Sequence, residues 1–153
     1  MIIQAGFDLQ ILARPLIVQD EKLYPRLVVI GLDAEMQLES IRVVTESFEG
    51  SLNPFRDAIL EDLDIEGSTY FAIAHAGIWA EDDYFNEQPI LAEAKHLSEA
   101  AARQGLHMIG HFGLDENGYM SNGPHSYFDQ YVLGDDLPET MLHWVHSRFG
   151  KCA

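Results

Sequence analysis

The chain has 153 residues, of which 47% are hydrophobic, which suffices for one buried core and gives no reason to divide residues 1–153 into separate domains. Its 25 acidic and 9 basic residues give a formal net charge of -16, which argues against nucleic acid as a partner, because such binding draws most of its affinity from Lys and Arg that neutralise phosphates. No apolar run approaches the ~20 residues of a membrane span, and the N-terminus lacks the basic start of a signal peptide, so we expect a cytoplasmic protein that does not bind a membrane.

The first part of the chain predicts strands. Residues 9–18 alternate between apolar and polar types well enough for an edge strand, and Pro15 within them is tolerated only at an edge or a bulge. Residues 26–32 form a strongly apolar run, and residues 37–48 read as its hairpin partner across a short polar turn. These patterns predict an antiparallel start to the sheet.

Three segments read as helices. Asn53 is a typical N-cap and is followed by proline, which predicts a helix over 54–63. Residues 89–104 place small and apolar side chains on one stripe and end before Gly105, a suitable C-terminal cap. Near the C-terminus, residues 137–149 have the amphipathic spacing of a further helix.

Residues 68–77 carry the most informative pattern in the chain. They form an almost wholly apolar strand of the kind that is buried on both faces, and His75 lies at its end. A loop rich in carboxylates follows at 78–88, and after the second helix comes another apolar strand at 106–112. Together the elements predict a single α/β (α+β) domain with a mixed sheet of about six strands flanked by helices.

The histidines are the main candidates for chemistry. A neutral imidazole at the rim of a rigid sheet, such as His75, is a natural metal ligand or general base. In a regular strand, His107 and His111 share a face but lie about 13 Å apart at ~3.3 Å per residue, which is too far to share one ion. We therefore expect that His107 and His111 do not form a metal pair.

Three short motifs resemble the RadC-like branch of the JAB/MPN (JAMM) domain family. They are Ala-His-Ala-Gly at 74–77, Gly-Leu-His-Met-Ile-Gly-His at 105–111 and Asp-Glu-Asn-Gly-Tyr-Met-Ser at 115–121. With weaker similarity upstream, the resemblance covers about 27–121. It implies the cytidine-deaminase-like fold of JAB domains. It also aligns His111 with the histidine of the family's Asp-His element, which implies that His111 is a binding residue beside the site.

The family's metal motif is degenerate in this chain. Members hold zinc through His-x-His followed by Ser-x-x-Asp, with an upstream glutamate that acts on the zinc-bound water. Aligned without gaps, the first histidine is His75, but the second falls on Gly77 and the serine and aspartate fall on Phe85 and Gln88. Glycine has no side chain, and a Gln amide is a poorer zinc ligand than a carboxylate.

The resemblance leaves two functions open. The leading hypothesis is a non-catalytic domain that binds a protein or another ligand and needs no cofactor. The alternative is a zinc-dependent metallopeptidase or isopeptidase, in which His75, Asp82 and Glu87 hold the metal and Glu46 joins His75 in catalysis. Metal content would distinguish the two.

The loop at 78–88 is the candidate docking surface for a protein or peptide. Its large side chains Trp79, Tyr84 and Phe85 are interleaved with carboxylates such as Asp83, a mixture that suits a protein contact. The same aromatic residues would equally serve as a plug over the end of the sheet. The acidic net charge also has two interpretations. It serves solubility, or it forms a surface that attracts a basic partner or imitates DNA.

The charge balance yields the first prediction. We expect the protein to show no more than marginal affinity for duplex DNA at physiological salt, because nine scattered basic residues cannot neutralise a row of phosphates. A fluorescence anisotropy titration measures this affinity. Tight binding that weakens steeply with added salt would contradict the charge argument.

Overall fold

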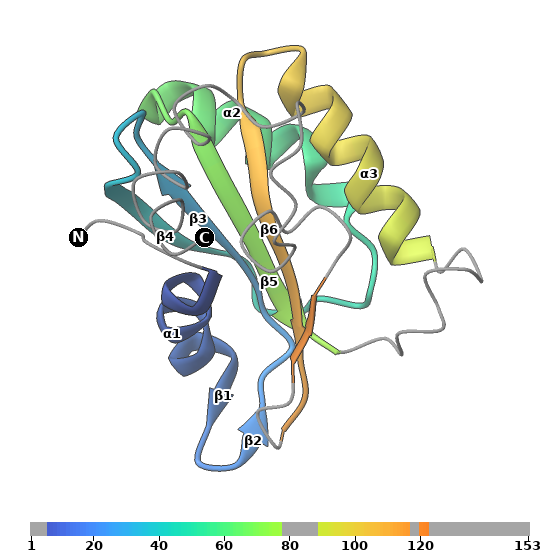
Figure 1. Cartoon of the computed structure of the whole chain (residues 1–153). Helices are drawn as coiled ribbons and strands as arrows, with labels where there is room; N and C mark the ends of the chain where they lie inside the picture. Colours follow the sequence, from blue (N-terminus) through green and yellow to red (C-terminus); the bar gives the residue numbers. More distant parts are fainter. Residues whose placement is uncertain (1–5, 78–88, 117–119, 123–153) are drawn as a thin grey trace, which may run out of the picture.

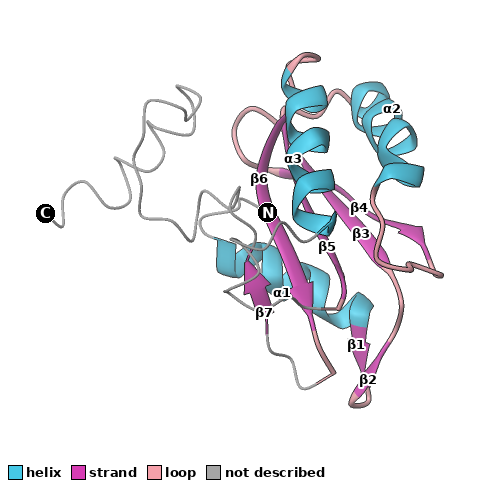
Figure 2. Ribbon diagram, turned by 90° about the vertical axis from the view of Figure 1, so that its right-hand side faces the viewer, coloured by secondary structure: helices cyan, strands magenta, loops and turns pink. Residues whose placement is uncertain are grey.

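The structure, a computed structural model, describes residues 6–77, 89–116 and 120–122. Helices lie on both faces of a central sheet (Figures 1 and 2). In chain order the elements are α1 (Gly6–Ile17), β1 (Val18–Gln19), β2 (Lys22–Leu23), β3 (Leu27–Leu32), β4 (Leu38–Thr45), the 3-10 helix η1 (Asn53–Phe55), α2 (Arg56–Glu66), β5 (Tyr70–Ala76), α3 (Pro89–Ala102), β6 (His107–Leu114) and β7 (Met120–Asn122).

The predicted mixed sheet is present. Its strands follow the order β4-β3-β5-β6-β7, while β1 and β2 form a separate two-stranded hairpin. Strand β3 is antiparallel to both β4 and β5, β5 is parallel to β6, and β7 is antiparallel to β6. The parallel pair is connected through α3, as a parallel crossover requires. The carboxyl ends of β4, β5 and β6 therefore meet at one edge of the sheet.

Two hydrophobic cores lie on opposite faces of the sheet. One lies between the sheet and α1, and it includes Val28, Ile30 and Ala72. The other lies between the sheet and the helices α2 and α3, and it includes Val29 and Ile73. Figure 2 shows α2 and α3 next to each other on one side of the sheet, with α1 on the other side. Because successive strand residues point to opposite faces, an apolar strand such as β5 supplies both cores.

Most of the predicted elements have the expected type and place. The antiparallel pair β3 and β4, the buried strands β5 and β6, and the helices α2 and α3 match the predicted segments to within a few residues. Gly105 lies three residues after Ala102, the last residue of α3, and its backbone N–H donates to the Ala102 carbonyl. Its φ of 79° is one that glycine adopts without strain. The predicted helix at 137–149 lies outside the described residues.

The predicted edge strand at 9–18 is wrong, because this segment forms α1. Leu9, Ala13 and Ile17 are fully buried at four-residue spacing, which places them on one helix face against the sheet. Pro15 lies in the last turn of the helix. The sequence of this segment fits the two-residue period of a strand and the 3.6-residue period of a helix. Burial of Leu9, Ala13 and Ile17 against the sheet favours the helix.

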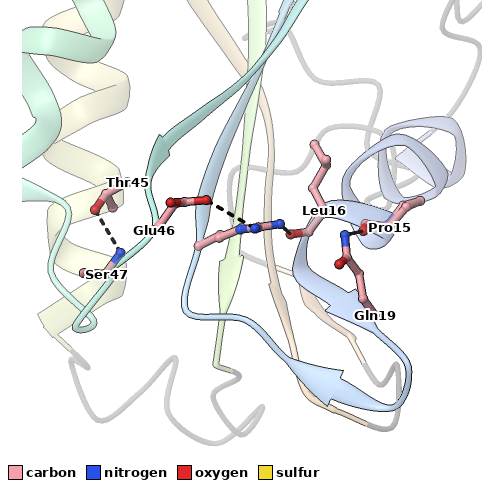
Figure 3. Close-up of polar contacts among 7 residues, drawn as sticks. Pro15, Leu16, Gln19, Thr45, Glu46 and Ser47 are labelled. Atoms are coloured by element: carbon pink, nitrogen blue, oxygen red, sulfur yellow. Dashed lines mark hydrogen bonds and ion pairs between the residues drawn. The ribbon is translucent and has the colours of Figure 1, made fainter.

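Side chains from the following segments hold the C-terminal end of α1. The Gln19 side-chain amide donates to the Pro15 carbonyl at 2.7 Å, and the Arg26 guanidinium donates to the Leu16 carbonyl at 3.0 Å (Figure 3). These donors satisfy carbonyl groups that have no partner within the helix.

Among the described residues no helix combines the length and the apolar character that crossing a membrane requires.

A residue from α3 holds the start of η1, the 3-10 turn that leads into α2. The N-cap of η1 is Leu52, without a side-chain capping hydrogen bond, and not the predicted Asn53. One carboxylate oxygen of Glu93 accepts hydrogen bonds from the Ser51 hydroxyl at 2.5 Å, the Leu52 backbone N–H at 3.1 Å and the Asn53 backbone N–H at 3.0 Å. A carboxylate at this position also interacts favourably with the positive end of the helix dipole. Glu93 therefore couples the two helices on this face.

We expect Glu93→Ala to reduce the free energy of unfolding by about 1–3 kcal/mol, because it leaves one hydroxyl and two backbone N–H groups without their common acceptor. Urea denaturation measures the loss. Glu99→Ala on the exposed side of the same helix is the control and should change the value by less than about 0.5 kcal/mol. Equal effects of the two substitutions would refute the coupling role of Glu93.

Candidate functional site

The candidate site lies at the edge where β5 and β6 end, and it is built on two buried histidines. His75 near the end of β5 has 2% of its surface exposed, and His111 of β6 has none. Their Nε2 atoms lie 2.8 Å apart, within hydrogen-bond distance. Among the buried residues of the described chain these two are the only histidines. They form a polar pair within a layer of apolar side chains, where each buried polar group needs a hydrogen-bond partner.

A bulge in β6 brings His111 to the same face as His75. Phe71 pairs with Met108, but the next residue of β5, Ala72, pairs with Gly110, so Ile109 is an extra residue in β6. One extra residue reverses which face each later side chain points to. His111 therefore faces α2 and α3, on the same side as His75.

The bulge also corrects the predicted relation between His107 and His111, which do not share a face. His107 pairs with Tyr70, and their ring centroids lie 6.0 Å apart. Tyr70 belongs to the core beneath α1, whereas His111 pairs with Ile73 of the core beneath α2 and α3. The two histidines of β6 are thus on opposite sides of the sheet, which agrees with the expectation that they do not form a metal pair.

The hydrogen bonds of the pair determine where the protons lie. Nδ1 of His75 is 3.1 Å from the Ala76 carbonyl oxygen, which can only accept, so this nitrogen carries the N–H. Nε2 of neutral His75 is then an acceptor, and His111 must donate its Nε2–H to it. The pair is therefore directional, with His111 as donor and His75 as acceptor.

The surroundings keep His75 neutral. Burial lowers the pKa of His75 from 6.5 to about 4, an effect that its hydrogen bond to the Ala76 carbonyl opposes only in part. The Phe48 ring packs against His75 with ring centroids 4.9 Å apart, and it belongs to the core on the same face. At neutral pH Nε2 of His75 therefore carries no proton and accepts the hydrogen bond from His111.

Glu46, the predicted upstream acid, pairs with Arg26. Its side chain is 73% exposed, and its carboxylate accepts a hydrogen bond from Arg26 at 3.2 Å. Arg26 in turn donates to the Leu16 carbonyl, so the dashed lines at Glu46 and Leu16 in Figure 3 both lead to this guanidinium. The structure brings His75 and His111 together and engages Glu46 between β4 and α1.

The other predicted site residues belong to the loop at 78–88, which lies outside the described residues. They are Trp79, Asp82, Asp83, Tyr84, Phe85 and Glu87. Two contributors to the site escaped the sequence prediction, namely the Phe48 ring and the bulge in β6. An isolated glycine within an apolar strand often marks a bulge, so Gly110 was the available signal for the second.

The histidine pair fits zinc in the chemistry of its donors and falls short in their number. Neutral imidazole nitrogens suit zinc, and two of them on a tetrahedral ion with bonds of about 2.0–2.1 Å lie roughly 3.3 Å apart. The observed 2.8 Å differs from this by about half an ångström. Within the described ranges no group of three or more His, Cys, Asp or Glu side chains is placed to share an ion.

Comparison with family models finds no match to this chain, and comparison with curated proteins finds none either. The resemblance to the RadC-like JAB family therefore rests on the three short motifs. Two described residues of these motifs, His75 and His111, are in hydrogen-bond contact with each other.

The lowered pKa of His75 predicts that acid destabilises the protein through this residue. The unfolded chain takes up a proton near pH 6.5, whereas the folded chain resists it until about pH 4. The contribution of His75 is therefore complete above about pH 6.5 and decreases as the pH falls towards about 4, by about 3 kcal/mol in total. Urea denaturation across this range measures the change.

The His75→Asn variant isolates this contribution, because the carboxylates titrate equally in both proteins. The difference in unfolding free energy between wild type and variant should shrink as the pH falls. His96→Asn, on the exposed side of α3, is the control and should leave the pH dependence as it is. A difference between wild type and His75→Asn that does not vary with pH would show that His75 is not held neutral by burial.

Proposed function

We propose that the chain is a RadC-like JAB-type domain that acts by binding a protein or another ligand at the sheet edge around His75 and His111, and not by hydrolysis. The observation that carries the proposal is the buried pair itself, in which Nε2 of each histidine is engaged by the other at 2.8 Å. In a hydrolytic zinc centre both nitrogens would instead face an ion with an open water position.

The architecture supports the JAB part of the proposal. A mixed sheet flanked by helices is what the resemblance implies, and the described chain has that arrangement. The strand β5 that ends at the Ala-His-Ala-Gly motif, the helix α3 and the strand β6 that carries His111 follow one another in the order of the family motifs. The two motifs converge at one edge because β5 and β6 are parallel.

Two substituted positions support binding over hydrolysis. Gly77 stands where the family has its second zinc-binding histidine, and its backbone N–H donates to the Leu114 carbonyl at 2.8 Å, so the chain here continues the pairing with β6. Glu46, the candidate for the family's upstream glutamate, is exposed and paired with Arg26. The residues that would complete a metal ligand set and activate a water are thus replaced or engaged in structural contacts.

A zinc-dependent metallopeptidase or isopeptidase remains the second candidate, and one observation favours it. The Nδ1–H of His75 donates to the Ala76 carbonyl, which is the type of outer contact that orients a metal-binding histidine and leaves Nε2 for the ion. In this hypothesis Asp82 and Glu87 supply the remaining ligands. Zinc would polarise the scissile carbonyl and lower the pKa of a bound water.

The proposed partner is a protein or peptide in the cytoplasm, and the contact surface is the loop at 78–88. A protein with 25 acidic and 9 basic residues attracts basic partners and repels nucleic acid. Trp79 would supply an amphipathic anchor of the type that dominates protein interfaces. This loop begins three residues after His75 in the chain, which supports a contact near the same sheet edge.

The binding function is tested through Trp79. We expect Trp79→Ala to abolish specific capture of a partner and to change the free energy of unfolding by no more than about 0.5 kcal/mol, as surface substitutions do. Ile11→Ala, at an exposed apolar position of α1 on the opposite face, should retain the partner. A loss on the order of 3 kcal/mol would identify Trp79 as a plug in the core and contradict its role as an anchor.

The enzymatic candidate is tested separately with zinc-loaded protein and isopeptide-linked substrates. The proposal expects the wild type to hydrolyse these no faster than His75→Ala does. Turnover that requires His75, Asp82 and Glu87 would overturn the non-catalytic proposal in favour of the metallopeptidase.

A further inference from the structure

We propose that the outer side of β4 is a second docking site, at which a basic, extended segment of another protein adds a strand to the sheet. Strands β3 and β5 separate β4 from β6 (Figure 1), so the site shares no residue with the pair of His75 and His111. The inference therefore goes beyond the proposed function and does not depend on it.

The hydrogen-bond pattern of β3 shows which backbone groups of β4 face outward. The Arg26 carbonyl accepts a hydrogen bond from β5 at 3.1 Å, so the backbone of Arg26 faces β5. Because this direction alternates along an antiparallel strand, the backbones of Val28 and Ile30 face β5 as well. Their partners in β4 are Val43 and Ile41, whose N–H and C=O groups consequently point away from β3.

This outward row of backbone groups is unpaired within the described part of the chain. There β4 is the outermost strand of the sheet, and outside its ladder with β3 it makes no backbone–backbone hydrogen bond. An open row of this kind is the template on which an extended peptide adds a strand, with main-chain hydrogen bonds that supply affinity.

Two bulges limit the length of the open ladder. Glu39 and Val44 are extra residues in β4 relative to β3, so the regular part of the strand runs over 40–43. Bulges on an edge strand hinder its pairing with another long edge, including that of a second copy of this chain. The regular part therefore suits a short extended segment, which needs only a few residues of ladder.

The side chains of the regular part determine the pattern of the occupant. Ile41 and Val43 lie on the face covered by α1, where Ile41 packs against the core and Val43 is 37% exposed. On the α2 face the Ser40 hydroxyl donates to Glu66 at 2.6 Å, and Arg42 pairs with the same carboxylate. Opposite residues of neighbouring strands share a face, so the occupant alternates apolar side chains beside Val43 with polar ones on the α2 side.

The charge around β4 favours a basic occupant. Residues 33–49 contain five acidic side chains and a single basic one, Arg42, which is paired with Glu66. Glu39 and Glu49, on either side of the regular part, are exposed. A second copy would bring the same carboxylates and a net charge of -16 to the interface, whereas lysine or arginine side chains complement it.

Binding of an alternating Lys–Val octapeptide to the full-length protein, measured by fluorescence anisotropy, tests the site. We expect Val43→Pro to lower the affinity at least about tenfold, because it removes an outward N–H and no hydrogen bond to β3. Val43→Thr keeps the N–H and a β-branched side chain, and its affinity should stay within about threefold of the wild type. Wild-type affinity in Val43→Pro would overturn the inference.

The role of charge is tested with a pair of matched substitutions. Glu39→Gln should weaken binding of the Lys–Val peptide and reduce its dependence on salt. Glu99→Gln, at an exposed position of α3, makes the same change in net charge and should have a smaller effect. Equal effects would show that the net charge alone attracts the peptide, and they would contradict a site at β4.

Two N-methylated forms of the peptide make the test independent of how the variants fold. Methyl groups on every valine nitrogen block one side of the extended peptide, and those on every lysine nitrogen block the other. One form should lose binding and the other retain it, and equal affinities would refute strand addition.

Sedimentation of the protein without peptide addresses the competing occupant. A wild-type dimer that Val43→Pro converts to a monomer would replace the basic segment with a second copy. Trp79→Ala should still bind the Lys–Val peptide, so failure of the β4 site and failure of the proposed binding function are distinguishable.

Discussion

The single extra residue in β6 is the constraint on which the rest of the site depends. Because Ile109 has no counterpart in β5, the side chains that follow it exchange faces, and His111 meets His75 beneath α2 and α3. A regular strand would have directed His111 towards the core beneath α1. The bulge therefore turns two isolated strand histidines into a contacting pair.

The environment of the pair explains why it is a contact and not two separate groups. A buried imidazole that makes no hydrogen bond costs a substantial part of its hydration energy, so each ring requires a polar partner within an apolar layer. The two rings satisfy this requirement for each other, and the Ala76 carbonyl satisfies a further nitrogen of His75. Phe48 covers the face of His75 and excludes water from it.

The side chains at the neighbouring strand end make structural contacts. At the end of β4, Glu46 is paired with Arg26, whose guanidinium also holds the C-terminal carbonyl of Leu16 in α1. On the other face, Glu93 of α3 holds the start of η1, which leads into α2, through three hydrogen bonds. Glu46 and Arg26 thus join the end of β4 to α1, and Glu93 joins α3 to the segment that leads into α2, while His75 and His111 contact each other. The pairing of Glu46 with Arg26 supports the proposed binding function over acid–base chemistry through Glu46.

The sequence by itself determined the elements whose pattern is strong and unambiguous: the apolar strand that ends at His75, the helix α3 closed by Gly105, and the mixed sheet they belong to. It also placed His111 beside the site, although through a resemblance and not through geometry. Only the tertiary structure decided the remainder. The segment 9–18 suits a strand or a helix locally, and packing of Leu9 and Ala13 against the sheet selects the helix. The facing of His111 depends on how β6 is registered against β5, a relation between distant segments that no local pattern encodes.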